Sequence, residues 1–389
     1  MATPGERQGG ASVANPTANR AYGDREGSLR SPQPTAFPPS YGMTKPRGHA
    51  IERISVLTAV LLLLGCHHPV QVKTQSHVTL TPPPLAAVGP LCETPLAGDC
   101  HSPCKIALLD VDGLLLNTDM VGLYSQGDNP VALFREKLEA AGADPRVRAV
   151  VLRINSYGGS VTASDIMWHD LVAFKGRSGL PVVACLMDVG TGGAYYLATG
   201  ADLILAHPTT VTGGMGVILN LYNLQDLMAQ FNILGVPIKA GSHVDLGSPI
   251  RPLDDEARRL LQAMANEFHA RFRQVVQQGR PQHDPRRDED FDGRVFTAQQ
   301  ALERHLIDRI GYLDDAVAMA GQMAGATSAR VVCYRRPSDS ARSVYAITPN
   351  VPIQTTLLPV SVPGIDRSKL PTFLYLWQPD PTMERLGGR

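Results

Sequence analysis

The sequence has no excess of charge of either sign and no long apolar run. Its 389 residues contain 36 Lys and Arg against 36 Asp and Glu, without a long basic stretch. Neutralising nucleic-acid phosphates needs clustered Lys and Arg, so the composition excludes a nucleic-acid-binding protein of that kind. A transmembrane helix needs about 18 consecutive apolar residues, and no run reaches that length. The chain is nevertheless long enough to bury one substantial core.

A shorter apolar run has the pattern of an export signal. Residues 54–64, "ISVLTAVLLLL", follow several basic residues and lead directly into Gly65 and Cys66. This order of basic, apolar and small residues is typical of a secretory signal peptide. The ending "LLGC" resembles a lipobox, in which Cys66 would become the lipidated first residue of the mature protein. The alternative is a buried core helix, which the proline, histidine and charge on both sides disfavour.

The apolar run begins too late for a signal peptide that starts at Met1, whereas Met43 is a suitable internal start. We therefore expect residues 1–42 to be a disordered leader or a start-site artefact, and 43–65 to be the signal peptide. Residues 66–104 then form a lipid-anchored, proline-rich linker. The expected product is an exported lipoprotein that faces the periplasm or the cell exterior. His67 follows the cysteine where an aspartate often marks inner-membrane retention, so the outer membrane is favoured.

Export would place the six cysteines in an oxidising compartment. Cys92, Cys100 and Cys104 lie close together in the sequence, with His101 among them. This cluster is either a metal site or a disulfide. It lacks the paired C-x2-C spacing of a structural zinc site, so we expect one disulfide and no metal. Cys185 lies in a predicted buried strand and is interpreted as a small core residue.

Strands and helices alternate from Lys105 onwards. Strands are expected at 105–113, 149–155, 180–187 and 203–208, and helices at 131–142, 163–174 and 194–201. Repeated strand–helix units with continuous apolar strands predict an α/β fold with a parallel sheet, here over residues 105–325.

A long amphipathic helix follows, capped by Asp254 or Asp255, with an apolar stripe between Leu260 and Val276. Such a stripe packs against the core or forms a subunit interface. Residues 326–389 form a C-terminal extension with an aromatic cluster, "TFLYLWQPD". The sequence leaves open whether this extension docks back onto the domain or contacts a partner or a membrane.

Two glycine-rich turns are candidates for chemistry. In "VLRINSYGGSV", Gly158 and Gly159 come directly after a buried strand. Glycines there let backbone N–H groups approach a ligand and form an oxyanion hole, although a plain strand-to-helix turn is equally consistent. In "DVGTGGAYYLATGAD", a glycine-rich turn enters a helix, as at the nucleophile of several hydrolases. That stretch contains no serine or cysteine.

These turns belong to a set of five motifs that together resemble the signal peptide peptidase SppA family, whose members are serine peptidases of the ClpP/crotonase fold. The resemblance extends over most of residues 105–323. The motifs occur in the family's order and read "INSYGGS", "DVGTGGAYYLATGAD", "HPTTVTGGMGV", "AGSHVDLGSP" and "FDGRVFTAQQALERHLIDRIGYLDDA". The resemblance implies an α/β fold of repeated β-α units, assembly into homo-oligomers, and a peptide or unfolded polypeptide as ligand. It implies no cofactor.

In this family a serine attacks the peptide carbonyl and a desolvated, neutral lysine accepts its proton. Ungapped flanking residues place the family's serine at Gly192 and its lysine at Val244. Neither residue can perform that chemistry. The implied oxyanion and peptide-binding positions are Gly158, Gly159 and Gly193, with Tyr157 where the family usually has proline.

Possible substitutes lie near both positions. Thr191 precedes the serine position, but an offset of one residue at a helix start turns the side chain by about 100°, so capping or packing is the simpler role. Lys239, on a predicted strand at 236–241, and His243 lie near the lysine position. Serines that could act instead are Ser156, Ser160 and Ser242.

Three hypotheses follow from the sequence. The first is a membrane-tethered, SppA-like protein that has lost its catalytic dyad and binds peptides or acts as a scaffold subunit. The second is an active endopeptidase of the same family that uses Thr191 or one of these serines. The third is a crotonase-like acyl-CoA enzyme. It shares the fold but not the five motifs, and an exported protein would not meet coenzyme A.

Overall fold

The computed structural model describes residues 89–121, 126–337, 343–345 and 373–377. The expected leader, the signal peptide, Cys66 and the linker up to residue 88 lie outside these residues. Within the described part, no helix is both long and apolar enough to cross a membrane.

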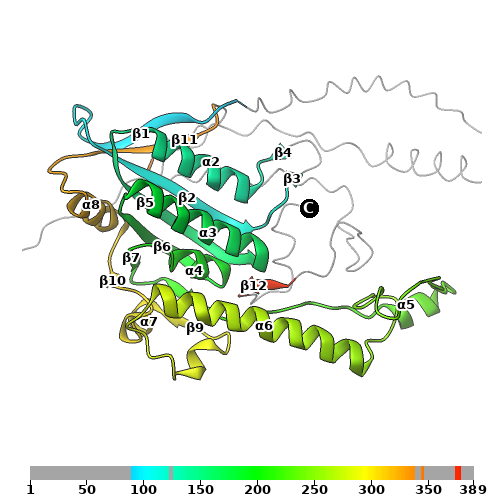
Figure 1. The fold of residues 1–389 in the computed structure, drawn as a ribbon. Helices are drawn as coiled ribbons and strands as arrows, with labels where there is room; N and C mark the ends of the chain where they lie inside the picture. Colours follow the sequence, from blue (N-terminus) through cyan, green and yellow to red (C-terminus); the bar gives the residue numbers. More distant parts are fainter. Residues whose placement is uncertain (1–88, 122–125, 338–342, 346–372, 378–389) are drawn as a thin grey trace, which may run out of the picture. The chain divides into compact units, whose positions relative to one another are not determined.

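The centre of the fold is a mostly parallel sheet (Figure 1). Its central strands are β2 (Lys105–Leu115), β5 (Val147–Ser160), β6 (Val182–Thr191) and β7 (Leu203–Ala206), which pair in this order and run parallel. The short strand β10 (Arg309–Ile310) continues the sheet beside β7. Because both faces of these strands are covered, they consist of near-continuous apolar residues. The expected α/β fold class is confirmed.

The sheet extends beyond the domain limits of 105–325 that the sequence suggested. β1 (Cys92–Gly98) pairs antiparallel with β11 (Arg330–Arg335), and β11 lies parallel to β2. The first strand of the sheet therefore lies before Lys105, where the sequence placed the start of the alternating strands and helices. β1 is an edge strand and most of its residues are exposed, so it lacks the apolar pattern that marks a buried strand.

The disulfide expected in the cysteine cluster is also wrong, because Cys92, Cys100 and Cys104 are all free. Cys92 pairs with Arg335 at one end of β1, whereas Cys100 follows the other end of that strand. An extended chain rises by about 3.3 Å per residue, so the intervening strand holds the two cysteines far apart. Cys185 is buried in β6, as predicted.

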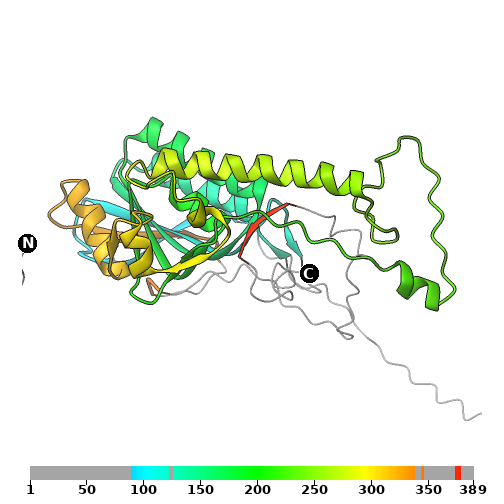
Figure 2. The ribbon, with the colours of Figure 1, turned by 90° about the horizontal axis from the view of Figure 1, so that it is seen from below.

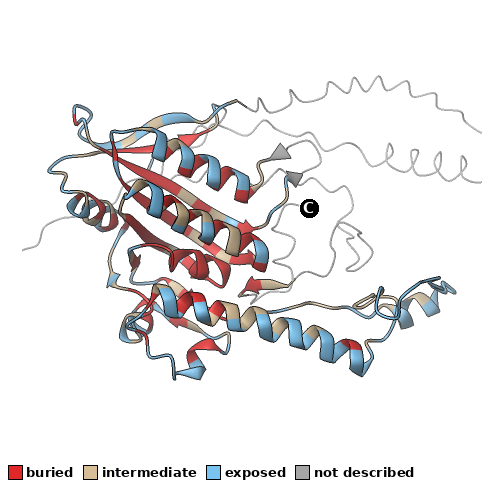
Figure 3. Cartoon of the chain, in the orientation of Figure 1, coloured by how far each residue is buried: buried red, intermediate tan, exposed pale blue. Residues whose placement is uncertain are grey.

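Helices cover both faces of the sheet (Figures 1 and 3). α2 (Pro130–Ala143), α3 (Val161–Ser178) and α4 (Gly193–Ala198) contribute to the larger apolar core. α8 (Leu313–Met323) packs with the alternate residues of β2, β5 and β6 in a second core. The local sequence sets where the helices begin: the side chain of Asn129 caps α2 and that of Ser160 caps α3.

The long helix α6 (Asp255–Gly279) begins as predicted, because the Asp254 side chain accepts a hydrogen bond from the N–H of Ala257. Only part of its apolar stripe is covered. Phe272, Val275 and Val276 are buried, while Leu260 and Met264, nearer its start, are more than 40% exposed. Figure 3 shows this change from buried to exposed residues along the helix.

Shorter elements complete the described part of the chain. They are β3 (Met120–Val121), β4 (Gln126–Gly127), β8 (Val211–Gly213), α5 (Gln225–Gln230), η1 (Asp288–Phe291), β9 (Val295–Thr297), α7 (Ala298–Glu303) and β12 (Leu374–Leu376). The strand expected at 236–241 is wrong, because these residues belong to no strand and are exposed. An isolated extended segment without a neighbouring strand has no ladder of hydrogen bonds to hold it.

Candidate functional site

The two glycine-rich turns lie next to each other at the carboxyl ends of β5 and β6. Ser156 pairs with Gly190 across these strands. Gly192 then begins α4, with φ +54° and ψ −124°, and its carbonyl accepts a hydrogen bond from the N–H of Tyr196. A sharp, strained turn from a strand into a helix is the backbone form that presents a hydrolase nucleophile. The turn at Gly192, called the elbow below, has this backbone form, and glycine carries no side chain there.

The three glycines expected to form an oxyanion pocket are close together. A Cβ built on Gly158, whose φ is +107°, would lie 2.6 Å from the nitrogen of Gly193. A Cβ built on Gly193 would lie 3.3 Å from the nitrogen of Gly159. The Ser156 hydroxyl supports this turn, because it accepts from the N–H of Gly158 (3.1 Å) and donates to the carbonyl of Gly113. Ser156 is fully buried and acts here as a structural residue.

A strand from the C-terminal extension occupies the groove beside these glycines. β12 pairs antiparallel with the end of β5, with Tyr375 opposite Gly159 (Figures 1 and 2). On its other side, Leu374 and Ile218 exchange two backbone hydrogen bonds of 2.9 and 3.0 Å. The extension therefore docks back onto the domain over the five described residues 373–377, which settles for them a question that the sequence left open.

Tyr375 is the centre of this strand. Its ring lies 4.6 Å from that of Phe272 and 5.3 Å from that of Tyr196, measured between centroids. Its hydroxyl donates to the carbonyl of Phe268 at 2.6 Å, and the whole residue is buried. Burial raises the pKa of the Tyr375 phenol above its ordinary value, so it stays protonated and remains a donor.

The carbonyl of Tyr375 lies directly against the elbow. A Cβ built on Gly192 would be 2.4 Å from the Tyr375 oxygen and 2.8 Å from its carbonyl carbon. A Cβ on Gly158 would be 2.0 Å from the same oxygen. Real Cβ atoms do not approach backbone this closely, so β12 lies in this position only because both residues are glycine.

The substitute nucleophiles have other partners. Thr191 is fully buried and its hydroxyl donates to the carbonyl of Tyr157 at 3.2 Å. Ser160 caps α3 by accepting from the N–H of Ala163 at 3.1 Å. Ser242 is exposed and lies in the segment between α5 and α6, outside the elbow.

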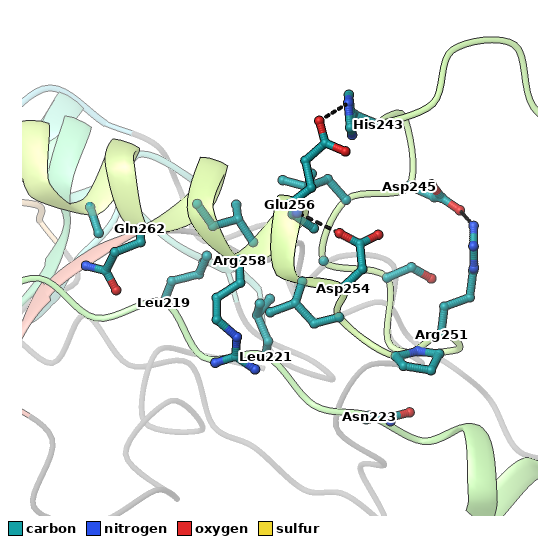
Figure 4. Close-up of a pocket in the computed structure, with 18 of the residues that line it drawn as sticks. Leu219, Leu221, Asn223, His243, Asp245, Arg251, Asp254, Glu256, Arg258 and Gln262 are labelled. Carbon is teal, nitrogen blue, oxygen red and sulfur yellow. Dashed lines mark hydrogen bonds and ion pairs between the residues drawn. The ribbon is translucent and has the colours of Figure 1, made fainter.

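The segment that carries Val244 lines a different part of the molecule. Its neighbours His243 and Asp245 face a pocket of about 630 Å³ that also reaches Ile218 and Phe373, beside the groove. Figure 4 shows this pocket, where His243 is 3.7 Å from Glu256. Val244 itself is 69% exposed.

The other substitute base, Lys239, is bound to a carboxylate. Its Nζ donates to Asp245 (2.6 Å) and to the carbonyl of Ser242 (3.0 Å). The hydrogen bond from Lys239, together with Arg251, lowers the pKa of Asp245 to about 2. This segment therefore holds a salt-bridged lysine instead of a desolvated one beside the elbow.

One group of possible metal ligands occurs among the described residues. Asp99, Cys100 and His101 have ligand atoms within 4.8 Å of one another. All three are exposed, adjacent in sequence and joined by local hydrogen bonds, so their proximity does not indicate a preorganised metal site. The absence of a metal stays a prediction.

The sequence did not predict that Tyr375 packs between the rings of Tyr196 and Phe272. Phe373, Tyr375 and Trp377 each contact an aromatic residue of the domain, the last by stacking on Tyr157 with centroids 6.0 Å apart. Their spacing of two residues is the signal that could have found them, because aromatic residues at alternate positions are typical of one face of a strand.

Comparison with known proteins agrees with the motifs. Residues 175–327 match the model of peptidase family S49. The chain is 29% identical over 231 residues to the putative signal peptide peptidase SppA of Enterococcus faecium, covering 59% of this chain and 67% of that protein. It is 29% identical over 219 residues to Protease 4 of Salmonella typhi, covering 56% of this chain but only 34% of the relative.

A structural relative is a membrane-bound stomatin-specific protease solved with a substrate peptide. The two share 16% identity and a TM-score of 0.39, over 60% of this chain and 93% of that one. The chain therefore carries a peptidase family S49 region and is similar to SppA and Protease 4 proteins over more than half of its length.

Proposed function

We propose that this protein is a membrane-tethered SppA-family member that has lost its catalytic dyad and binds peptides without cleaving them, as a peptide-binding or scaffold subunit. The observation that carries this proposal is the elbow at Gly192, which keeps the backbone form of a nucleophile turn without a nucleophile. Loss of a nucleophile or its base typically lowers kcat by about 10⁴- to 10⁶-fold.

The positions of the neighbouring hydroxyl groups support the loss of catalysis. Thr191 is buried and its hydroxyl donates to the backbone carbonyl of Tyr157. Ser156 and Ser160 hold backbone groups of the β5 turn and of α3. A hydroxyl becomes a nucleophile only when a base takes its proton, and within the described part of the chain none of these three is hydrogen-bonded to a histidine or lysine.

The strand-shaped groove supports peptide binding. It holds one extended segment, β12, between β5 on one side and Ile218 on the other. Adding a strand to an exposed sheet edge is a common way for proteins to bind peptides, because main-chain hydrogen bonds supply affinity and side-chain pockets supply specificity.

Membrane tethering and assembly rest on other features. Cys66 at the end of the lipobox-like sequence is the proposed lipid anchor, which would place the domain outside the cytoplasm, at the outer membrane in a cell with two membranes. The segment between α5 and α6 exposes Phe231, Leu234, Val236 and Ile238 by more than two thirds of their surface. A cluster of exposed apolar residues of this kind supports contact with a second copy of the chain.

The test is a cleavage assay on residues 67–389 with denatured protein and hydrophobic fluorogenic peptides. We expect no turnover from the natural sequence, and compare Thr191→Ala, the isosteric Thr191→Val, and the double variant Gly192→Ser/Val244→Lys. Turnover by the natural sequence that both Thr191 variants abolish would establish the active endopeptidase instead. Turnover confined to the double variant would support the proposal.

A further inference from the structure

We propose that His283 is a positioning residue for the peptide-binding groove. Through Asp290 it fixes residues 291–294, and this turn in turn fixes residues 213–218, which form the side of the groove opposite β5 and are called the wall below. The inference rests on the proposed function in one respect, since it treats the groove as a peptide-binding site. It adds the buried cluster that holds this site at the spacing a peptide needs.

The first support is a buried cluster of three side chains next to the turn. The side chains of His283 and Asp290 are fully buried, and Nε2 of His283 lies 3.0 Å from Oδ2 of Asp290. The other oxygen of Asp290 accepts a hydrogen bond from Nε of Arg304, also at 3.0 Å. A carboxylate oxygen can only accept, so Nε2 carries the hydrogen of the imidazole and donates it. The cluster thus joins the segment after α6, η1 and the end of α7.

The second support is the contact between the turn and the wall. The carbonyl of Arg294 accepts a hydrogen bond from the N–H of Gly214 at 2.8 Å. A Cβ built on Gly216 would lie 3.1 Å from Cα of Gly293, so the two backbones touch. A cavity of about 350 Å³ is lined by the wall on one side and by α6 on another. The wall is therefore supported by the turn more than by the helix.

The third support is the spacing that a bound strand requires. The strand in the groove pairs with β5 on one side and exchanges two hydrogen bonds with Ile218 on the other. Neighbouring strands lie about 4.8 Å apart, so the wall must stay about 9.6 Å from β5 to serve both sides. N–H···O bonds span about 2.7–3.2 Å, so a shift of the wall by about 1 Å would break the bonds on one side. The wall also holds the elbow, because the N–H of Gly192 donates to the carbonyl of Gly213 at 2.9 Å.

The second nitrogen of His283 indicates that this residue provides position more than stability. Its Nδ1 is buried and has no hydrogen-bond partner among the residues that the structure describes. A buried polar atom without a partner is destabilising, whereas leucine at this position would bury no polar atom. The charge of Asp290 would still be paired with Arg304. What His283 supplies is the Nε2 donor that fixes Asp290 from the segment after α6.

The experiment compares His283→Leu, which removes the donor, with His283→Gln, whose amide nitrogen replaces Nε2. Hydrogen–deuterium exchange is measured at the amides of Gly192, Gly214 and Ile218, which are hydrogen-bonded along the wall. A hydrogen bond to a charged group changes an equilibrium constant by about 10- to 100-fold, so exchange at these amides should be faster in His283→Leu by about that factor. His283→Gln should restore exchange to close to that of the unaltered chain.

The second readout is the affinity for a peptide. The probe is the labelled peptide TFLYLWQ, which reproduces residues 372–378, because its central residues form the strand seen in the groove. Fluorescence anisotropy measures its binding to the Tyr375→Ala chain, whose own strand has lost its central side chain. In this background His283→Leu should weaken binding by about 10- to 100-fold, and His283→Gln should restore it.

Two further variants separate position from stability. Leu313→Ala truncates a fully buried residue of the second core, so it lowers stability without touching the wall. It should leave the peptide affinity and the exchange at the three amides unchanged, because groove amides exchange by local opening. His283→Asn guards against misfolding of the leucine variant: it has the same amide as glutamine on a side chain one methylene shorter, and should behave like leucine.

Equal exchange at the three amides in the unaltered chain, His283→Leu and His283→Gln would overturn the inference, and so would equal acceleration in the leucine and glutamine variants. Peptide that binds with the same affinity with and without His283→Leu would also overturn it, while leaving peptide binding intact. Peptide that binds none of the proteins would overturn the proposed peptide binding, and the exchange at the three amides would still decide whether His283 positions the wall.

Discussion

The contact between the elbow and β12 can be tested by adding a single methyl group. In Gly192→Ala the new Cβ would lie 2.4 Å from the Tyr375 oxygen, so the strand must move away. The residue also has a positive φ, which alanine tolerates poorly. Gly179→Ala is the matched control: its φ is +66°, and its Cβ would meet nothing within 4 Å.

Gly179 lies in the left-handed region, where an L-residue costs about 1–2 kcal/mol. Gly192, with ψ −124°, lies outside that region, and the backbone cost of alanine there is about 1–3 kcal/mol. Gly192→Ala loses in addition the burial of Tyr375, about 1.5–3 kcal/mol, and its aromatic pairs, about 0.5–1.5 kcal/mol. The main-chain hydrogen bonds of β12 are lost as well, and the chain entropy regained by the released strand offsets part of the total. We expect Gly192→Ala to lower the free energy of unfolding by about 1–3 kcal/mol more than Gly179→Ala.

Urea unfolding measures the two losses, and hydrogen–deuterium exchange shows where they arise. Gly192→Ala should accelerate exchange at the amides of Leu374 and Trp377, which are hydrogen-bonded in the groove. Gly179→Ala should leave them unchanged. Equal losses of stability, with unaltered exchange at these two amides in Gly192→Ala, would refute the contact between Gly192 and the strand.

Three further predictions concern other parts of the chain. Burial raises the pKa of Asp112 to about 6, so the folded state holds this proton more tightly than the unfolded state. Through this residue, the free energy of unfolding should therefore fall by up to about 3 kcal/mol as the pH rises from about 4 to about 6. Asp112→Asn should remove this part of the pH dependence, which urea unfolding at a series of pH values measures. A pH dependence that the substitution leaves unchanged would contradict the raised pKa of Asp112. Leu234→Asp with Ile238→Asp should reduce the molar mass measured by light scattering, whereas a monomeric natural protein would refute the proposed assembly. Cys66→Ser should move the protein from the membrane to the soluble fraction, and full retention at the membrane would refute the anchor.

Much of the core could be predicted because its strands are continuously apolar. The segments around β2, β5, β6 and β7 are short, continuous apolar runs, which are typical of strands buried on both faces. α3 begins directly after Ser160, whose side chain caps it. β1 was not predicted because an edge strand with exposed side chains has only a weak hydrophobic pattern. The strand expected around Lys239 failed for the opposite reason: the apolar pattern is present, but no neighbouring strand pairs with it.

The site was predictable only where its residues lie close together in the sequence or follow neighbouring strands. Gly158, Gly159, Gly192 and Gly193 belong to two short motifs at the ends of neighbouring parallel strands, so their proximity follows from the topology. The occupant of the groove was not predictable, because Tyr375 meets residue 192 across more than 180 positions of sequence. Local patterns hold no information about such a contact.

The most direct measurement is the intact mass of the tyrosine-centred peptide TFLYLWQ after it has been bound by the Tyr375→Ala chain and recovered. Gly192 has no nucleophile, and the groove still binds a strand, so we predict that the peptide is retained by the protein and recovered whole after prolonged incubation. Fragments cut within the bound peptide, at a rate that Thr191→Val abolishes, would contradict the loss of catalysis.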